Sequence, residues 1–310
     1  MIIYQGDPSG WDAPPNGSAV AIGVFDGVHV GHRRVLEALR DVDTGLTTVA
    51  MTFGTHPASL LSPDGAPLRL STLKRRFDLL EDAGVDRIAV LGFDEEMRTM
   101  TPEDFVLRFL VEGLNARFAV VGTGFRFGRD AAGSTETLVE FGQRYGFQVK
   151  VIDIACDDGI EIRSTTIREA LSDGDVERAA MMLGRPYDLE GIVVPNGGRG
   201  TQMGVPTANV SFPASLTVPR RGVYAVIAVI DGIGHPAVAN LGIRPTFGGE
   251  DQVLEVHVLE FDRDLYGKHI RIEFVEWIRE EIRFDSVDDL VTQIHDDIAS
   301  ATQKLTEHTS

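Results

Sequence analysis

The chain has 310 residues, of which 43% are hydrophobic, a length and composition typical of a globular protein with two domains. Its net charge of -18 argues against a broad nucleic-acid surface but not against one nucleotide in a local pocket, and no apolar run approaches the ~18 residues of a membrane span. Because Cys156 is the one cysteine and no secretory signal pattern is visible, we expect no intramolecular disulfide and a cytoplasmic location.

The first part of the chain alternates strand-like and helix-like patterns. Strand-like runs of β-branched and apolar residues cover 19–25, 48–53, 87–91, 118–121 and 147–154. Amphipathic helix-like runs lie between them, at 31–41, 72–83, 102–112 and 135–145. This alternation with short connections predicts a parallel α/β sheet, in which ligands bind beyond the carboxyl ends of the strands.

The turn between the first strand and the first helix is the most informative segment. Residues 23–32 read GVFDGVHVGH, with His29 and His32 three residues apart. Glycines such as Gly31 let the backbone come close to a ligand, and the free N–H groups of a helix N-terminus attract phosphate. Both imidazoles can donate hydrogen bonds to the same anion, which predicts a phosphate site. The alternative is a turn with two exposed histidines.

After residue 184 the pattern changes. Runs of β-branched residues broken by Gly and Pro cover 189–194, 223–230, 237–241, 253–261 and 270–275. This pattern predicts a small antiparallel β-barrel. A last amphipathic helix is expected from Val287, with an N-cap at Asp285-Ser286, and residues 303–310 are expected to be loose.

Two groups of polar residues in the second half carry the signature of a reaction site. Thr207 and Asn209 share a face if their segment is extended, and hydroxyl and amide oxygens suit Mg²⁺; the alternative is an Asx-type turn. Glu255 shares the face of a predicted strand with His257 and Leu259. A carboxylate on a mostly apolar strand is costly to bury without a partner or a function, although an exposed edge glutamate is the alternative.

In order and spacing, motifs along nearly the whole chain resemble those of prokaryotic bifunctional riboflavin kinase/FAD synthetases. The first half carries the motifs GVFDGVHVGH (23–32), TFGTHP (52–57), VVGTGFRFG (120–128) and STTIREAL (164–171). The second half carries LGRPY (183–187), GVPTANV (204–210), RGVYAV (221–226), NLGIRPTFGG (240–249), LEVHVLEFDRDLYGK (254–268) and RFDSVDDL (283–290). The resemblance implies a Rossmann-like α/β nucleotidyltransferase domain over 1–183 and a β-barrel riboflavin kinase domain with a C-terminal helix over 184–310.

The resemblance also implies two reactions and their small-molecule substrates. Riboflavin and ATP give FMN, and FMN with a second ATP gives FAD and pyrophosphate. Mg²⁺ is implied as cofactor. Nucleic acid and membrane are not expected as partners, and the sequence leaves the oligomeric state open.

By resemblance, each reaction has its own residues. Glu255 is the base for the ribityl hydroxyl, while Thr207 and Asn209 hold Mg²⁺ and phosphates. A loop with Gly198, Arg199 and Gly204 covers the phosphates, although Thr201 and Val205 depart from the family pattern there. His29 and His32 stabilise charge on the phosphate under attack. The remaining ATP-site residues are Gly23, Phe25, Asp26, Gly31, Ser164, Thr165 and Arg168, and the remaining flavin-site residues are Phe127, Arg279 and Glu280.

Some of these residues also have a simpler structural interpretation. Ser164-Thr165 is also suited to a plain helix N-cap, and Arg279-Glu280 to a solvated charge pair at a helix end. Three departures from the family pattern converge on the adenylyl-transfer site, at Gly54 with Thr55, Gly124 and Arg163. They raise the alternative of a riboflavin kinase whose N-terminal domain is inactive or altered. A third hypothesis is a nucleotidyltransferase for another alcohol phosphate, such as a pantetheine or glycerol phosphate.

Overall fold

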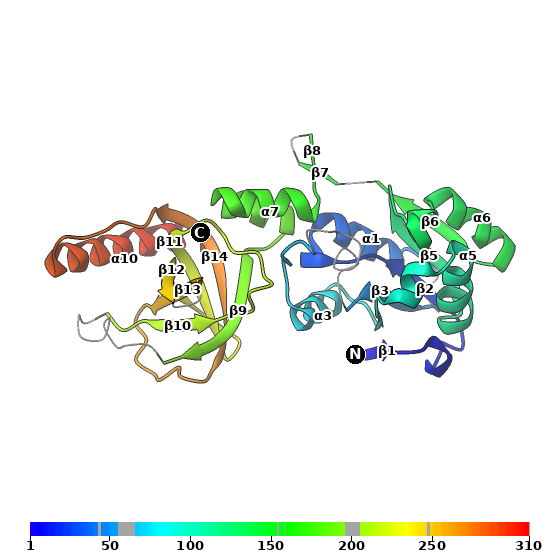
Figure 1. Ribbon diagram of the computed structural model, residues 1–310, viewed down its shortest axis with the longest axis horizontal. Helices are drawn as coiled ribbons and strands as arrows, with labels where there is room; N and C mark the ends of the chain where they lie inside the picture. Colours follow the sequence, from blue (N-terminus) through cyan, green and yellow to red (C-terminus); the bar gives the residue numbers. More distant parts are fainter. Residues whose placement is uncertain are drawn as a thin grey trace. The chain divides into compact units, whose positions relative to one another are not determined.

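The computed structural model describes residues 1–42, 45–54, 66–153, 155–157, 159–195, 205–246 and 249–309 (Figure 1). Contacts divide the chain into two compact units, Met1–Ser164 and Thr165–Ser310. Helix α7 (Ser164–Asp173) begins at the last residue of the first unit, and α8 (Val176–Leu183) packs against the barrel of the second. The functional boundary expected between 183 and 184 stays a prediction.

The first unit contains a six-stranded sheet in the order β1-β4-β3-β2-β5-β6, with every neighbouring pair parallel. The strands are β1 (Ile2–Gln5), β2 (Ser18–Ile22), β3 (Thr47–Phe53), β4 (Arg87–Leu91), β5 (Ala116–Gly122) and β6 (Gln148–Ile152). This confirms the predicted parallel α/β architecture. The edge strand β1 was not predicted, because four residues are too few to show a periodicity.

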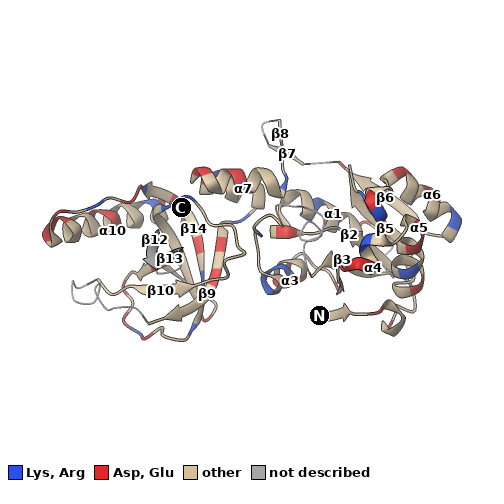
Figure 2. Cartoon of the chain, viewed as in Figure 1, with Lys and Arg blue, Asp and Glu red and all other residues tan. Residues whose placement is uncertain are grey.

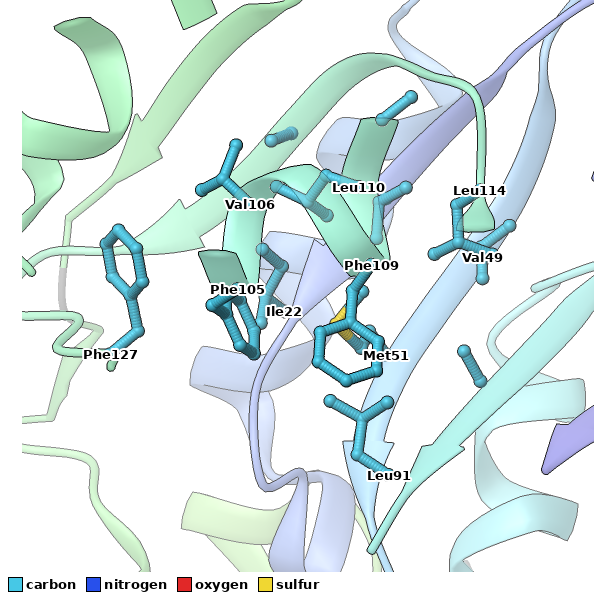
Figure 3. Close-up of a cluster of buried hydrophobic side chains, with 14 of the residues drawn as sticks. Ile22, Val49, Met51, Leu91, Phe105, Val106, Phe109, Leu110, Leu114 and Phe127 are labelled. Atoms are coloured by element: carbon cyan, nitrogen blue, oxygen red, sulfur yellow. The ribbon is translucent and has the colours of Figure 1, made fainter. Parts of the chain in front are cut away.

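Helices cover both faces of this sheet, so its central strands are buried on both sides. They are α1 (Val30–Arg40), α3 (Leu73–Asp82), α4 (Glu95–Thr99), α5 (Pro102–Phe105) and α6 (Thr135–Tyr145), with short 3-10 turns η1 (Pro8–Gly10), η2 (Asp26–Val28) and η4 (Arg129–Ala131). Ala19 and Ala21 of β2 pack in the core under α1 and α3, while Val20 and Ile22 pack in the opposite core. Figure 3 shows that second core, in which Phe105 and Phe109 lie beside Ile22 and Met51.

The strand order places a topological switch at β2. The chain leaves β2 for β3 and β4 on one side, and β5 then returns to pair with β2 on the other side. Crossovers on opposite sides of one strand open a crevice at its carboxyl end, where such sheets bind ligands. The turn after β2, Gly54 after β3 and the turn after β5 all lie at this edge.

Two expectations for this unit were wrong in detail. The segment 102–112 is not one α-helix, because α5 continues as a π-helix, η3 (Val106–Gly113), whose buried residues include Val106, Phe109 and Leu110. Strand β2, the first strand predicted from the sequence, ends at Ile22 rather than at residue 25. Phe25 instead adopts a left-handed conformation with φ of 52°, which turns the chain away from the sheet.

The second unit is a closed antiparallel barrel in the order β10-β13-β12-β11-β14-β9. Its strands are β9 (Tyr187–Val194), β10 (Ala208–Ser211), β11 (Gly222–Ile230), β12 (Ile233–Thr246), β13 (Gly249–Val258) and β14 (His269–Arg279). The predicted barrel is confirmed. A two-stranded ribbon, β7 (Cys156–Asp157) and β8 (Ile160–Glu161), precedes α7.

Helix α10 (Val287–Thr309) packs against the outer face of the barrel. Ser286 caps it, because its Oγ accepts the N–H of Asp289 at 3.1 Å. The expectation that residues 303–310 are loose was wrong for 303–309, since Leu305 is buried against β11 and the helix continues to Thr309. Arg279 of β14 donates two hydrogen bonds to the carboxylate of Asp297 on α10, from Nε at 2.8 Å and from Nη2 at 2.6 Å.

Asp and Glu residues are spread along elements of both units rather than gathered in one element (Figure 2). In the described part of the chain, no helix has both the length and the apolar character to cross a membrane.

The Arg279–Asp297 pair predicts how α10 is held. The side chains are only 19% and 6% exposed, so Asp297→Asn leaves a mostly buried guanidinium without its counter-charge. We expect the free energy of unfolding of the barrel unit to fall by about 2 kcal/mol, measured by urea denaturation. As control, Asp231→Asn removes a carboxylate from the exposed Lys268–Asp231 pair and is expected to change the midpoint little. Equal midpoints for both variants would contradict this account of α10.

Candidate active sites of the two units

The turn after β2 is shaped by its backbone and by a histidine cap. Phe25 and Gly27 both have positive φ, and α1 then begins with His29 as its N-cap. The Nδ1 of His29 accepts the N–H of His32 at 3.3 Å. Since Nδ1 is an acceptor, the proton of the neutral ring lies on Nε2, the nitrogen that can donate to an anion. The helix N-terminus at this edge supplies a partial positive charge as well.

The two imidazoles lie against each other. Their ring centroids are 3.6 Å apart with an interplanar angle of 19°, and Phe25 meets the His32 ring edge-on at 5.2 Å. A Cβ on Gly31 would lie 3.1 Å from Nδ1 of His29, so glycine leaves room for this stacking. The alternative of two exposed histidines is wrong for His29, which is 6% exposed.

Burial holds the pKa of His32 well below its ordinary value of 6.5, and the nearby His29 and the charge of Arg76 lower it further. The Nδ1 atom of His32 is buried and has no hydrogen-bond partner among the described residues. His32 is therefore a neutral imidazole at physiological pH, and its ring is held mainly by packing.

A buried ion pair supports the turn from beneath. Asp26 and Arg76 have side chains 2% exposed each, with Nη2 of Arg76 4.0 Å from Oδ1 of Asp26. The carboxylate of Asp26 accepts the N–H groups of Leu70 at 3.0 Å and Ser71 at 3.3 Å. Nη1 of Arg76 donates to the carbonyl of Phe53 at 2.9 Å. The pair therefore ties the end of β3 and the segment before α3 to the histidine turn.

The other residues expected at the ATP site are placed in different ways. Gly23 lies at the end of β2, where its N–H donates to the carbonyl of Met51 at 3.1 Å. The hydroxyl of Ser164 donates to the carbonyl of Asp26 at 3.3 Å, which brings the start of α7 to the turn. Its hydroxyl thus bonds to the turn in a way that a plain N-cap does not. Thr165 and Arg168 follow on α7, in the part of the chain that contacts assign to the second unit.

Two aromatic residues expected at the sites are buried among protein atoms. Phe25 is 1% exposed and Phe127 is 6% exposed. Phe127 stacks on Phe125 with centroids 5.4 Å apart and packs against Phe105 in the core shown in Figure 3. Any contact of these side chains with a ligand stays a prediction.

The three departures from the family pattern leave the backbone of the edge intact. Gly124 has φ of +82° in the turn closed by the N–H of Phe125 on the carbonyl of Gly122, a conformation that also tolerates Asn or Asp. Gly54 continues from β3, and its N–H donates to the carbonyl of Leu91 at 2.9 Å. Arg163 donates from Nε to Glu161 at 2.6 Å, with both side chains about half exposed. Thr55 lies outside the described residues.

In the second unit the pairing of β10 with β13 assembles the expected kinase residues. Asn209 lies directly opposite Glu255, and the register continued by one residue places Thr207 opposite His257. Side chains two residues apart on a strand share a face. Thr207, Asn209, Glu255 and His257 therefore form a two-by-two patch, which we call the β10/β13 patch. The expected extended segment at 207–209 is confirmed for Ala208–Ser211.

The β10/β13 patch lies on the outer face of the barrel. Glu255 pairs with Asn240 of β12, which pairs with Val223 of β11, and Val223 packs under α10. Leu254 and Val256 point the other way and are almost fully buried. The patch is therefore on the outer face of the barrel, the same face that α10 covers over the neighbouring strands β11 and β12. Thr207, Glu255 and His257 are half-buried there.

The patch fits a divalent cation through oxygen donors of Thr207 and Asn209, the donor type that Mg²⁺ prefers. Asn209 is 5% exposed, and its Nδ2 is buried without a hydrogen-bond partner among the described residues. No described residue therefore holds the side-chain amide of Asn209 in one orientation through its nitrogen. A half-turn about the Cβ–Cγ bond places Oδ1 where Nδ2 now lies. In the same part of the chain, no group of three or more His, Cys, Asp and Glu side chains could hold a metal by itself.

The remaining kinase residues are not brought to the patch by any described contact. Gly198, Arg199 and Gly204, with Thr201, lie outside the described residues. Arg279 binds Asp297 as described above, and Glu280 pairs with Arg220. The expected flavin contacts of Arg279 and Glu280 stay predictions.

Sequence reasoning missed Arg76. A signal was present, since Arg76 lies three residues after Leu73 and four before Leu80, at a position of the apolar stripe of α3. A charged residue on the apolar face of a helix indicates a buried partner. Its partner could not be identified, because Asp26 is 50 positions away in the sequence.

The first unit has a histidine pair at the switch point of a parallel sheet, and the second has carboxylate and amide side chains on the outer face of a barrel. This combination in one chain fits a nucleotide-dependent transferase with two domains. Comparisons with known proteins identify the families that the two parts of the chain match. A family model described as FAD synthetase matches residues 12–166, and one described as riboflavin kinase matches residues 183–305.

Curated relatives match the whole chain. The bifunctional riboflavin kinase/FMN adenylyltransferase of Escherichia coli (strain K12) is 38% identical over 308 residues, which cover 98% of this chain and 97% of the relative. The protein of the same description from Bacillus subtilis (strain 168) is 36% identical over 287 residues, 90% of each chain. A solved structure described as a macrolide-efflux protein from Streptococcus pneumoniae is 30% identical with a TM-score of 0.89, covering 97% of this chain and 99% of that one.

The chain belongs to the family of bifunctional riboflavin kinases/FMN adenylyltransferases. Both enzyme domains are present in it, so the comparisons support the bifunctional hypothesis and not the alternative of a kinase alone.

The lowered pKa of His32 has a consequence for pH dependence. The folded protein keeps this ring neutral, so unfolding takes up a proton once the pH is below the ordinary value of 6.5. The contribution of His32 to stability is thus complete above pH 6.5 and is lost as the pH falls toward the folded-state pKa. We expect NMR titration to show the His32 ring still neutral at pH 6.5, and a midpoint at or above this pH would contradict the burial argument.

Arg76 is predicted to support adenylyl transfer and the stability of the first unit. Arg76→Met leaves Asp26 buried without its counter-charge, which is expected to cost about 3 kcal/mol of unfolding free energy and to slow FMN-to-FAD conversion about tenfold or more. Riboflavin phosphorylation by the same sample reports on the intact second unit. Lys74→Met, at a 72% exposed position on the same helix, serves as matched control and should change neither property. Wild-type FAD synthesis by Arg76→Met would show that the pair is dispensable.

Proposed function

We propose that this chain makes FMN and FAD at two separate sites. In the barrel unit, riboflavin is phosphorylated by ATP to FMN at the β10/β13 patch. In the sheet unit, FMN attacks the α-phosphate of ATP at the histidine turn, giving FAD and pyrophosphate. The observation that carries the kinase assignment is the register that puts Asn209 opposite Glu255. The division of roles between 1–183 and 184–310 is part of the proposal.

Phosphoryl transfer needs a hydroxyl nucleophile, a nearby base and neutralisation of phosphate charge. Glu255 is a half-buried carboxylate on the rigid strand β13, which suits a base for the ribityl hydroxyl. Thr207 and Asn209 would hold Mg²⁺, which would neutralise phosphate charge when bound. Asn209 is fixed by ladder partners on both sides, Val194 and Glu255, so its position does not depend on the ligand.

Adenylyl transfer needs no covalent intermediate, so the protein acts by positioning and by donors aimed at the developing phosphate charge. His29 is suited to this role, because its Nδ1 is occupied by the helix cap and its Nε2 carries the proton. His32, kept neutral by burial, is held against it. Negative charge arriving on the polyphosphate favours the protonated form of an imidazole, which strengthens its hydrogen bonds.

The departures at Gly54, Gly124 and Arg163 are compatible with this proposal. Gly124 has a left-handed conformation that Asn and Asp also tolerate, Gly54 has no positive φ, and the charge of Arg163 is partly balanced by Glu161. The histidine turn, its cap and the Asp26–Arg76 pair are all formed in this chain. A cytoplasmic location and a requirement for Mg²⁺ remain predictions within this proposal.

Glu255→Gln tests the assignment of the two reactions. An amide keeps the size of the side chain but is no base, so FMN formation should fall by about 100-fold or more. Conversion of supplied FMN to FAD should stay near wild type, as a chromatographic time course with riboflavin or FMN, Mg²⁺ and ATP would show. Glu260→Gln, at an exposed position just after β13, is the matched control. Equal loss of both reactions in Glu255→Gln would contradict separate sites.

A further inference from the structure

The β10/β13 patch has a fourth member, His257, to which the kinase reaction gives no role. Thr207, Asn209 and Glu255 account for three corners, and the register continued by one residue past Ala208–Val256 puts His257 at the corner opposite Thr207. Its ring is half-buried on the same outer face as Glu255. The contacts of its side chain therefore indicate what His257 does in the patch.

The His257 ring contacts the backbone of the segment that carries Thr207. Its Nδ1 lies 2.8 Å from the carbonyl oxygen of Pro206. A carbonyl only accepts hydrogen bonds, so Nδ1 carries the proton and donates it. This contact assigns the ring a definite tautomer while it is neutral.

The contact lies where the strand ladder ends. The last backbone pair between β10 and β13 is Ala208 with Val256, and Pro206 has no N–H with which to extend the ladder. A side-chain donor from β13 takes the place of the missing backbone bond. It holds the chain one residue before Thr207, whose hydroxyl would otherwise depend on an unpaired segment for its position.

We propose that His257 is a positioning residue of the kinase site, which fixes Pro206-Thr207 against β13 so that Thr207 keeps its place beside Asn209 and Glu255. The inference rests on the proposed function of the β10/β13 patch. Because the ring holds a ligand-binding segment and does not touch the transferred group, its loss weakens the binding of Mg²⁺-ATP more than it slows the chemical step.

Three variants separate the hydrogen bond from the ring. In His257→Asn the amide nitrogen lies near the place of Nδ1, so the bond to Pro206 can be kept. In His257→Gln the nitrogen lies near the place of Nε2, and His257→Phe has a ring without donors. We expect Gln and Phe to raise the KM for Mg²⁺-ATP in FMN formation by about threefold to tenfold, the loss that one neutral hydrogen bond brings. The Asn variant should stay within about twofold of wild type, and kcat should change little in all three.

A second readout does not use the reaction. Hydrogen–deuterium exchange at the amides of Thr207 and Ala208 reports directly on how firmly the segment is held. Exchange should be faster in the Gln and Phe variants and unchanged in Asn, with no ligand added. The half-exposed position makes unfolding a small risk, and FMN-to-FAD conversion by each variant checks the sample. If Phe fails to fold, the comparison of Asn with Gln still decides.

The outcomes distinguish this inference from the function on which it rests. Wild-type KM and exchange in all variants, or an Asn variant as impaired as Phe, would overturn the positioning role. A fall in kcat with unchanged KM would also overturn it, in favour of a part in the chemical step. Asn209→Ala is run beside them. If it leaves FMN formation intact, the assignment of the patch itself fails, whatever His257 does.

Discussion

The kinase half of this protein depends on one register, the antiparallel pairing that sets Asn209 of β10 against Glu255 of β13. A slip of β10 by one residue would turn Asn209 to the interior, away from Glu255, and bring Val210 to the surface. The register is fixed from the apolar side, because Val210, Leu254 and Val256 are all buried. The core of the barrel therefore determines the geometry of the polar face above it, and the site needs no separate scaffold.

In the first unit, a different interaction holds the candidate site residues in place. Its site is assembled from turns after parallel strands, which have no ladder between them. The buried Asp26–Arg76 pair takes that role by joining the histidine turn to the end of β3. Burying charge is expensive, and the desolvation that lowers the pKa of Arg76 is opposed by Asp26. Arginine suits this position because its fork can bond a carbonyl and face a carboxylate at once.

Much of the architecture could be predicted from the sequence, and the failures have physical causes. A short apolar run and a period-3.6 pattern identified β4 (Arg87–Leu91) and α6 (Thr135–Tyr145) to the residue. The short strand β1 and the π-helical turn η3 were missed, since four residues show no period and a change of helix type leaves the apolar spacing almost unaltered. His29, Asn209 and Glu255 could be selected as candidates from the sequence because the patterns that indicate them are local. Arg76 and the contact of His257 were not, because they depend on residues distant in sequence.

The helix cap at His29 also bears on the balance between stability and activity in this chain. Histidine is not among the residues that cap helices best, and Asn, Asp or Ser at the same place would satisfy the N–H of His32 more favourably. Stability alone would therefore not choose an imidazole there. The proposed adenylyl transfer supplies a second requirement, because an imidazole whose Nδ1 caps the helix keeps the Nε2 proton for a hydrogen bond to an anion. On that proposal, a weaker helix cap is the cost of a donor at the phosphate site, and both properties depend on one side chain.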